Sequence, residues 1–221
     1  MGRDIPSIVR GVQDDYRKLY YSDDQASLKV PVTIMAGYGQ IIAGTALAKN
    51  GSAAGGIGKV IPYDPSSITG AEEAPARLYL VQDSGTTETE LYVTIDDSYK
   101  VGVADDVYIV DDTTAKEQLG AITAIDRTTY TNRAKITVTT ATGSTSFTTA
   151  RFAYLAVEGA DTCVGIAEKS TDTGTGADAK GALSVNILGN CVLYTEVLSN
   201  FDAAAIADLS AGSWGIYTYL K

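Results

Sequence analysis

The sequence predicts a mainly β protein in which a small antiparallel β-barrel interrupts a second β-rich domain that contains one short helix. The first observation behind this prediction is a series of short segments rich in β-branched and aromatic residues, at 78–81, 90–95, 107–110, 120–125, 134–139 and 152–157. Asp, Gly, Thr and Asn separate these segments, and such spacing is typical of a small barrel or sandwich. The second observation is that the two flanking stretches share a composition that differs from that of the middle.

We therefore expect three parts: an N-terminal arm at 1–28, a discontinuous domain at 29–75 and 160–221, and an inserted barrel at 76–159. Pro62 and Pro65 favour an extended connector before the barrel. Within the barrel, Ile136 and Val138 alternate with polar residues, which predicts one apolar face and one wet face for that strand.

The flanking stretches contain further strand signals and one helix signal. Strands are expected near 30–35, 40–43, 45–48, 163–168, 182–188, 191–196 and 214–220. Residues 203–209 favour a helix, which Asp202 can cap and Gly212 can close. The polar, glycine-containing stretch at 170–178 is expected to be a mobile loop.

Composition excludes several classes of function. The formal net charge is −10, which disfavours nucleic acid as a partner because phosphate groups would be repelled. The chain has no His, so it lacks the commonest general base and the commonest metal ligand. Tyr dominates the aromatic residues, with 14 Tyr against three Phe and one Trp, and suits half-buried strand faces and interfaces. We expect no enzymatic activity and no cofactor.

Cysteine usage and hydropathy bear on the compartment. Cys163 and Cys191 are too few for a disulfide scaffold, and two buried free thiols or a single bridge remain as alternatives. No apolar run approaches the roughly 18 residues that a membrane span needs, so no membrane partner is expected. The first residues show no secretory leader pattern. We expect a protein that folds in a reducing cytoplasm.

Three sequence patterns invite a chemical interpretation. The stretch 53–59 is similar to a phosphate-binding loop, but Ala53 stands where Gly is required and Val60 where Ser or Thr is required. The glycines at 37 and 39 lack the third glycine of a dinucleotide motif, so both stretches are interpreted as turns. The acidic pairs at 96–97, 105–106 and 111–112 fit turn-stabilising side chains, with a cation site as the alternative.

The N-terminal arm carries apolar side chains at helical spacing, although Pro6, Gly11 and its acidic pairs oppose a long helix. Such a segment either packs on its own domain or docks on another subunit or protein. The residues that we expect at such an interface are Ile5, Ile8, Val12, Tyr16, Tyr20 and Tyr21.

Two flanking stretches resemble known proteins. Residues 41–49 followed by 60–64, and residues 163–167 followed by 182–190, resemble the head decoration (capsid cement) proteins of tailed bacteriophages of the lambda type. The resemblance covers less than half of the chain, and the stretch at 107–126 is similar to small β-barrel insertions in phage structural proteins.

The resemblance implies a β-tulip-like decoration domain interrupted by the inserted barrel. It also implies a structural virion protein, made in the host cytoplasm, that binds the capsid exterior and stabilises the expanded shell. The expected partners are the major capsid protein and two further copies of the chain in a homotrimer. The alternatives are a tail or fibre-base virion component, or a carbohydrate- or cation-binding β module.

Overall fold

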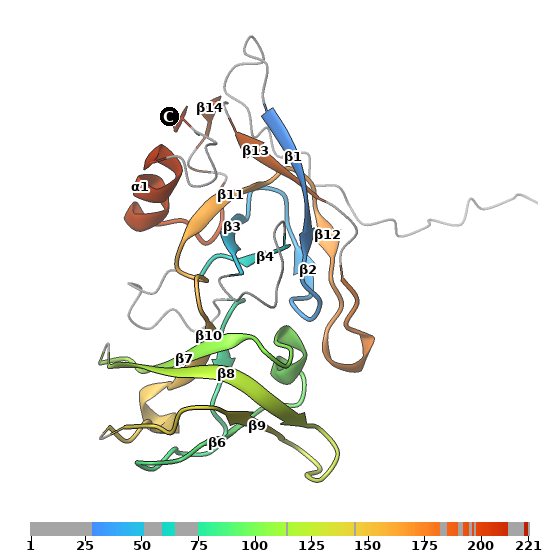
Figure 1. Cartoon of the computed structure of the whole chain (residues 1–221). Coiled ribbons are helices and arrows are strands. Elements are labelled where there is room, and N and C mark those ends of the chain that lie inside the picture. Colours follow the sequence, from blue (N-terminus) through green and yellow to red (C-terminus); the bar gives the residue numbers. More distant parts are fainter. Residues whose placement is uncertain are drawn as a thin grey trace, which may run out of the picture.

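A computed structural model describes residues 28–50, 59–64, 75–113, 115–143, 145–181, 185–189, 192–194, 196, 198–211 and 219–220. Over these residues the protein is mainly β, with a single α-helix, α1 (Ala203–Ala211), and three short 3-10 turns. The predicted fold class, mainly β with one short helix, is confirmed. Two curled sheets dominate, one above the other in Figure 1.

The upper sheet is a closed five-stranded barrel with the strand order β1-β13-β11-β3-β4. It takes strands from both sides of the middle stretch: β1 (Leu28–Ile34), β3 (Ala46–Lys49), β4 (Lys59–Pro62), β11 (Cys163–Ala167) and β13 (Val185–Gly189). The parallel pairing of β1 with β4 closes the barrel, and the other four pairings are antiparallel. Closure leaves no free sheet edge on this barrel.

Both faces of β3, β4 and β11 are largely covered, whereas β1 leaves Pro31 and Thr33 exposed. All five residues of β11 are buried, and so are the first three of β3 and the last three of β4. This explains why these strands appear in the sequence as continuous apolar runs without alternation. Helix α1 lies against β11 and buries Ala205 and Leu209. The helix begins as predicted, because the Asp202 carboxylate accepts the Ala205 N–H at 2.8 Å.

The lower sheet has six strands in the order β5-β10-β7-β8-β9-β6, and all neighbouring pairs are antiparallel. The strands are β5 (Leu78–Tyr79), β6 (Glu90–Val93), β7 (Asp106–Val110), β8 (Lys116–Asp126), β9 (Ala134–Val138) and β10 (Tyr154–Val157). An antiparallel bridge between Leu80 and Val93 joins the two edge strands, so the sheet curls until its edges meet. Each of the six predicted segments contributes one strand.

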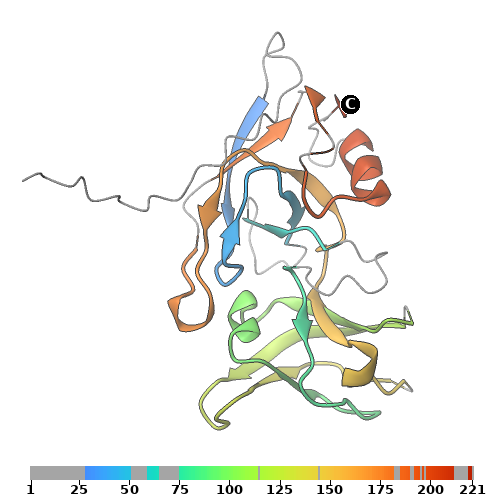
Figure 2. The same ribbon diagram turned by 180° about the vertical axis from the view of Figure 1, so that it is seen from behind.

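Burial alternates along the strands β6 and β9 of this sheet, whereas β7 and β10 are buried on both faces. In β9, Ala134, Ile136 and Val138 are buried, whereas Lys135 and Thr137 are partly exposed. The predicted apolar and wet faces of this strand are confirmed. The inward residues of both sheets belong to one continuous apolar core, and β10 leads from the lower sheet into the upper one (Figure 2).

The stretch at 170–178, predicted to be a loop, contains regular structure. Residues Thr171–Asp172 form β12, which pairs with β2 (Gln40–Ile41), and Gly176–Asp178 form a 3-10 turn, η3. Thr173 is fully buried; its hydroxyl accepts the Tyr38 N–H and donates to the Gly39 carbonyl. Short polar side chains here form hydrogen bonds with the backbone of a neighbouring turn, which composition alone does not reveal.

A further two-stranded sheet is formed by the parallel pair β14 (Val192–Leu193) and β15 (Tyr219–Leu220).

Candidate functional site

The residues predicted to form an interface lie outside the described residues. Ile5, Ile8, Val12, Tyr16, Tyr20 and Tyr21 all precede position 28, where the description begins. Most of the stretch at 53–59 that is similar to a phosphate-binding loop also lies outside the described residues. The candidate sites that the structure does describe are the junction between the two sheets and one surface of the lower sheet.

Two of the paired aspartates, Asp105 and Asp111, stabilise turns. The Asp105 carboxylate accepts the Gly102 N–H at 2.8 Å, and the Asp111 carboxylate accepts the Thr113 and Ala115 N–H groups at 2.9 and 3.2 Å. These are the bonds expected of turn-stabilising aspartates. Among the described residues, no group of three or more acidic or cysteine side chains is arranged to hold a metal ion.

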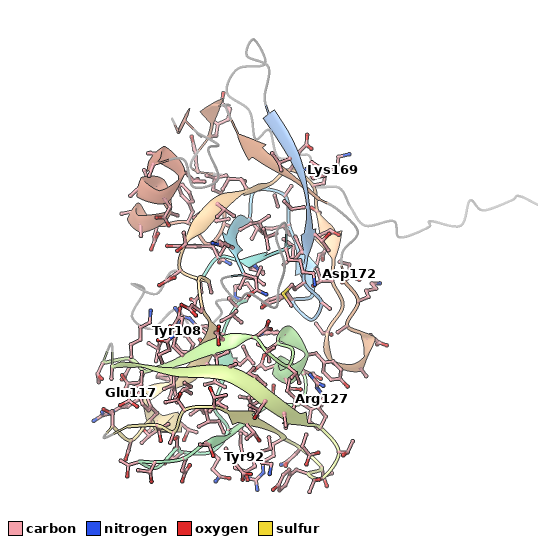
Figure 3. The ribbon with its side chains drawn as sticks, viewed as in Figure 1. Tyr92, Tyr108, Glu117, Arg127, Lys169 and Asp172 are labelled. Carbon is pink, nitrogen blue, oxygen red and sulfur yellow. The ribbon has the colours of Figure 1, made fainter. Side chains whose placement is uncertain are left out.

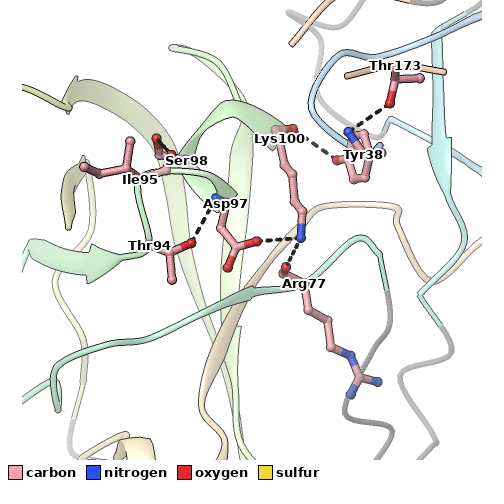
Figure 4. A network of polar contacts seen from close by, with 8 residues as sticks. All are labelled: Tyr38, Arg77, Thr94, Ile95, Asp97, Ser98, Lys100 and Thr173. Atoms are coloured by element: carbon pink, nitrogen blue, oxygen red, sulfur yellow. Dashed lines mark hydrogen bonds and ion pairs between the residues drawn. The ribbon is translucent and has the colours of Figure 1, made fainter. Parts of the chain in front are cut away.

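The junction is built around the 3-10 turn η1 (Asp97–Lys100) of the lower sheet (Figure 4). The Lys100 ammonium pairs with Asp97 at 2.6 Å and donates to the Arg77 carbonyl at 2.9 Å. The Tyr38 hydroxyl, from the turn between β1 and β2, donates to the Lys100 carbonyl at 3.1 Å. The upper barrel therefore holds a backbone segment of the lower sheet.

Close backbone packing reinforces this contact. Gly37 has a φ of +95°, a conformation that residues with a side chain rarely adopt. A Cβ at this position would lie 2.6 Å from the Tyr99 carbonyl oxygen. Glycine is therefore required at position 37, because a side chain there would keep the turn from approaching η1.

A buried ion pair spans the same junction. The Arg77 Nε donates to the Asp64 Oδ1 at 2.8 Å, and the two side chains are 4% and 0% exposed. The guanidinium also stacks on the Tyr154 ring, 4.4 Å from its centroid. Burial raises the pKa of the Asp64 carboxyl, and the charge and hydrogen bond of Arg77 oppose that rise. The pair links the chain that leaves β4 to the chain that enters β5.

A second polar cluster ties helix α1 to the barrel. The Tyr63 hydroxyl donates to Asp202 at 2.9 Å, and the Cys163 N–H donates to the Asp208 carboxylate at 2.8 Å. Cys163 is a buried free thiol, and burial raises its pKa to about 12. This agrees with the expectation of a buried free thiol for Cys163; Cys191 lies outside the described residues.

The outward face of the β6–β9 ribbon carries a distinct group of side chains, Tyr92, Tyr130 and Arg133, which we call the tyrosine–arginine patch. The two tyrosine rings meet edge to face, with centroids 5.4 Å apart and an interplanar angle of 89°. The Arg133 guanidinium lies 4.5 Å from the Tyr92 centroid and 4.9 Å from the Tyr130 centroid. Figure 3 shows Tyr92 on the side of the lower sheet that faces away from the upper barrel.

Sequence reasoning did not identify this patch. Alternation within β6 places Tyr92 outward, because Leu91 and Val93 are buried. However, Tyr130 and Arg133 come from the turn between β8 and β9, and only the strand pairing brings that turn beside β6. Tyr92 was the one member of the patch whose outward position could be inferred from the sequence.

Comparisons with protein families, with curated proteins and with solved structures give no match for this chain. In the part of the chain that the structure describes, no helix is long and apolar enough to cross a membrane.

Proposed function

We propose that this protein is a structural virion protein that binds the outside of the expanded phage capsid and stabilises the shell. It acts as a homotrimer beside the major capsid protein and has no enzymatic activity. The proposal starts from the resemblance of residues 41–49, 60–64, 163–167 and 182–190 to lambda-type head decoration proteins.

The observation that carries the proposal is the common sheet formed by those stretches. They contribute β13, β11, β3 and β4, which lie side by side in that order in the same barrel. About a hundred residues of sequence separate β4 from β11. Separate stretches that resemble one small domain are expected to pack as one domain. Had they belonged to different sheets, the resemblance would carry no weight.

The rest of the described chain suits a structural role. Its buried charges and hydroxyls hold segments of the two sheets and the helix to one another, as in the Asp64–Arg77 pair and the Tyr63–Asp202 bond. A protein whose parts are held rigidly together loses little conformational freedom when it docks on a surface. Many copies on one shell also multiply a modest affinity at each site.

The arm at 1–28 is the proposed capsid contact. The test is cosedimentation of the purified full chain with expanded and unexpanded shells of the major capsid protein encoded by the same genome. We expect saturable binding to expanded shells and a rise in their melting temperature. A chain that lacks residues 1–27 should keep its far-UV circular dichroism and lose binding.

Point variants sharpen the test of the arm. Ile8→Asp combined with Val12→Asp should abolish binding, because charged groups would replace the apolar contact. Thr86→Asp, which adds a charge to an exposed turn of the lower sheet, serves as the control and should bind normally. Full-affinity binding by the truncated chain would show that the arm is not the contact. Absence of binding by the intact chain would refute the proposed function.

A further inference from the structure

The tyrosine–arginine patch has the features of a ligand site. We propose that it binds the carboxylate group of an acidic saccharide. This inference does not rest on capsid binding, because the patch belongs to the lower sheet and the proposed capsid contact belongs to the arm.

The Arg133 guanidinium has free hydrogen-bonding capacity. A guanidinium carries five N–H donors, and in the structure Arg133 donates from one nitrogen, to the Gln82 side-chain oxygen at 2.6 Å. No carboxylate among the described residues pairs with it. Arg77, in contrast, is paired with Asp64, and Arg127 donates from two nitrogens to Ser98. Arg133 therefore retains donors for an external acceptor.

The Arg133 guanidinium is held in place before any ligand arrives. Two aromatic rings contact Arg133, and the amide of Gln82 holds one of its nitrogens. A stacked guanidinium keeps its edge available for the two parallel hydrogen bonds that a carboxylate accepts. Because the side chain is already ordered, a ligand pays less entropy to bind.

The charges around the patch favour a ligand with a single carboxylate. The neighbouring Lys135 is neutralised by Glu90 at 2.8 Å, so Arg133 supplies the local positive charge. The chain as a whole has a formal net charge of −10, which repels a highly charged polyanion at long range. A ligand with a single carboxylate fits one local positive charge on a negatively charged protein better than a ligand with a dense row of anionic groups.

The surface around the patch suits a saccharide better than a protein partner. The centre of a protein interface is usually apolar, whereas the exposed residues of the β8–β9 turn have hydroxyl or amide side chains. They are Thr128, Thr129, Thr131 and Asn132. The hydroxyls of Tyr92 and Tyr130 lie 3.4 Å apart at the same surface. A carbohydrate offers the matching hydroxyl groups around its carboxylate.

The test uses the intact chain and three probes. A hyaluronan-derived tetrasaccharide supplies glucuronate, chitotetraose is its neutral counterpart, and a short glutamate peptide supplies carboxylates without sugar. Titrations followed by isothermal calorimetry and by ligand-observed NMR should show binding of the acidic tetrasaccharide, weakening as salt is added. Chitotetraose should bind at least about tenfold more weakly, because it lacks the charge-assisted bond.

Variants locate the site. Arg133→Gln should weaken binding of the acidic tetrasaccharide about tenfold or more, and Arg133→Lys should restore part of it because Lys keeps the charge but not the planar fork. Lys180→Gln removes a charge from an exposed pair on the upper side of the molecule and should change nothing. Circular dichroism melting should show that all three variants fold. Capsid binding should be unaffected by Arg133→Gln, so the two proposals can fail separately.

Several results would overturn the inference. They are no binding of the acidic tetrasaccharide, equal binding of the neutral one, or unchanged binding by the Arg133→Gln variant. Tighter binding of the glutamate peptide than of the tetrasaccharide would assign the patch to a protein partner instead.

Discussion

Replacing Arg77 by Met is expected to weaken the protein substantially. The variant keeps a long side chain beside the Tyr154 ring but removes the guanidinium from the Asp64 carboxylate. Asp64 is fully buried, and its second oxygen has no hydrogen-bond partner among the described residues. Leaving such a charge without its partner costs about 3–5 kcal/mol of folding free energy. For a chain of this length that loss lowers the melting temperature by about 6–20 °C.

The pH dependence of the Arg77→Met variant provides a second readout. Without the guanidinium, burial raises the pKa of Asp64 further. In the unfolded variant the Asp64 carboxyl ionises above about pH 4, whereas in the native variant it keeps its proton to a higher pH. The stability of the variant therefore falls as pH rises through this window, so its deficit relative to the wild type should be larger at about pH 8 than at about pH 5.

The assay is urea unfolding followed by far-UV circular dichroism at both pH values. The matched control is the double variant Asp64→Asn with Arg77→Met, in which no charge is buried. It should recover more than half of the loss and show little pH dependence, since replacing a whole buried pair is often nearly neutral. A cost below about 1 kcal/mol for Arg77→Met, or a double variant no more stable than the single one, would refute the reasoning.

Three further changes test other parts of the structure. Gly37→Ala should cost about 1–3 kcal/mol and speed proteolysis at the junction, because of its positive φ and its contact with η1, whereas Gly102→Ala, which has room for a Cβ, should be near neutral by thermal melting. Asp202→Ala should cost about 1–2 kcal/mol in urea unfolding through the lost helix cap and the lost Tyr63 hydrogen bond, with Asp202→Asn losing less; equal losses would contradict the role of the Asp202 side-chain oxygen as an acceptor. In a Cys191→Ser variant, Cys163 should resist Ellman's reagent at about pH 8 until the protein unfolds, since its raised pKa and burial suppress the thiolate; rapid native reaction would contradict this.

Local patterns in the sequence were sufficient to predict most of the strands. Short segments rich in β-branched and aromatic residues, separated by turn residues, located the strands of the lower sheet, and the cap at Asp202 located helix α1. In both cases the signal lies within a few consecutive residues. The buried strands of the upper barrel were also recognisable from their short apolar runs, because both of their faces are covered.

Features that depend on distant residues were not predicted. The parallel closure of the barrel by β1 and β4, and the pairing of β12 with β2, join segments whose match is set by the whole fold. The buried Asp64–Arg77 pair was missed because charged residues in a connector normally indicate solvent. The tyrosine–arginine patch was missed because its members come from two separate elements.

The central claim, that this protein decorates a capsid, is tested most directly by a cryo-electron microscopy reconstruction of a particle that carries the chain. The account predicts density on the outside of the expanded shell, in groups of three copies, with the N-terminal arm against the shell. The lower sheet should point outward, with the β6–β9 ribbon accessible to solvent. Density on the tail or at the fibre base, or no density on the shell, would contradict the account.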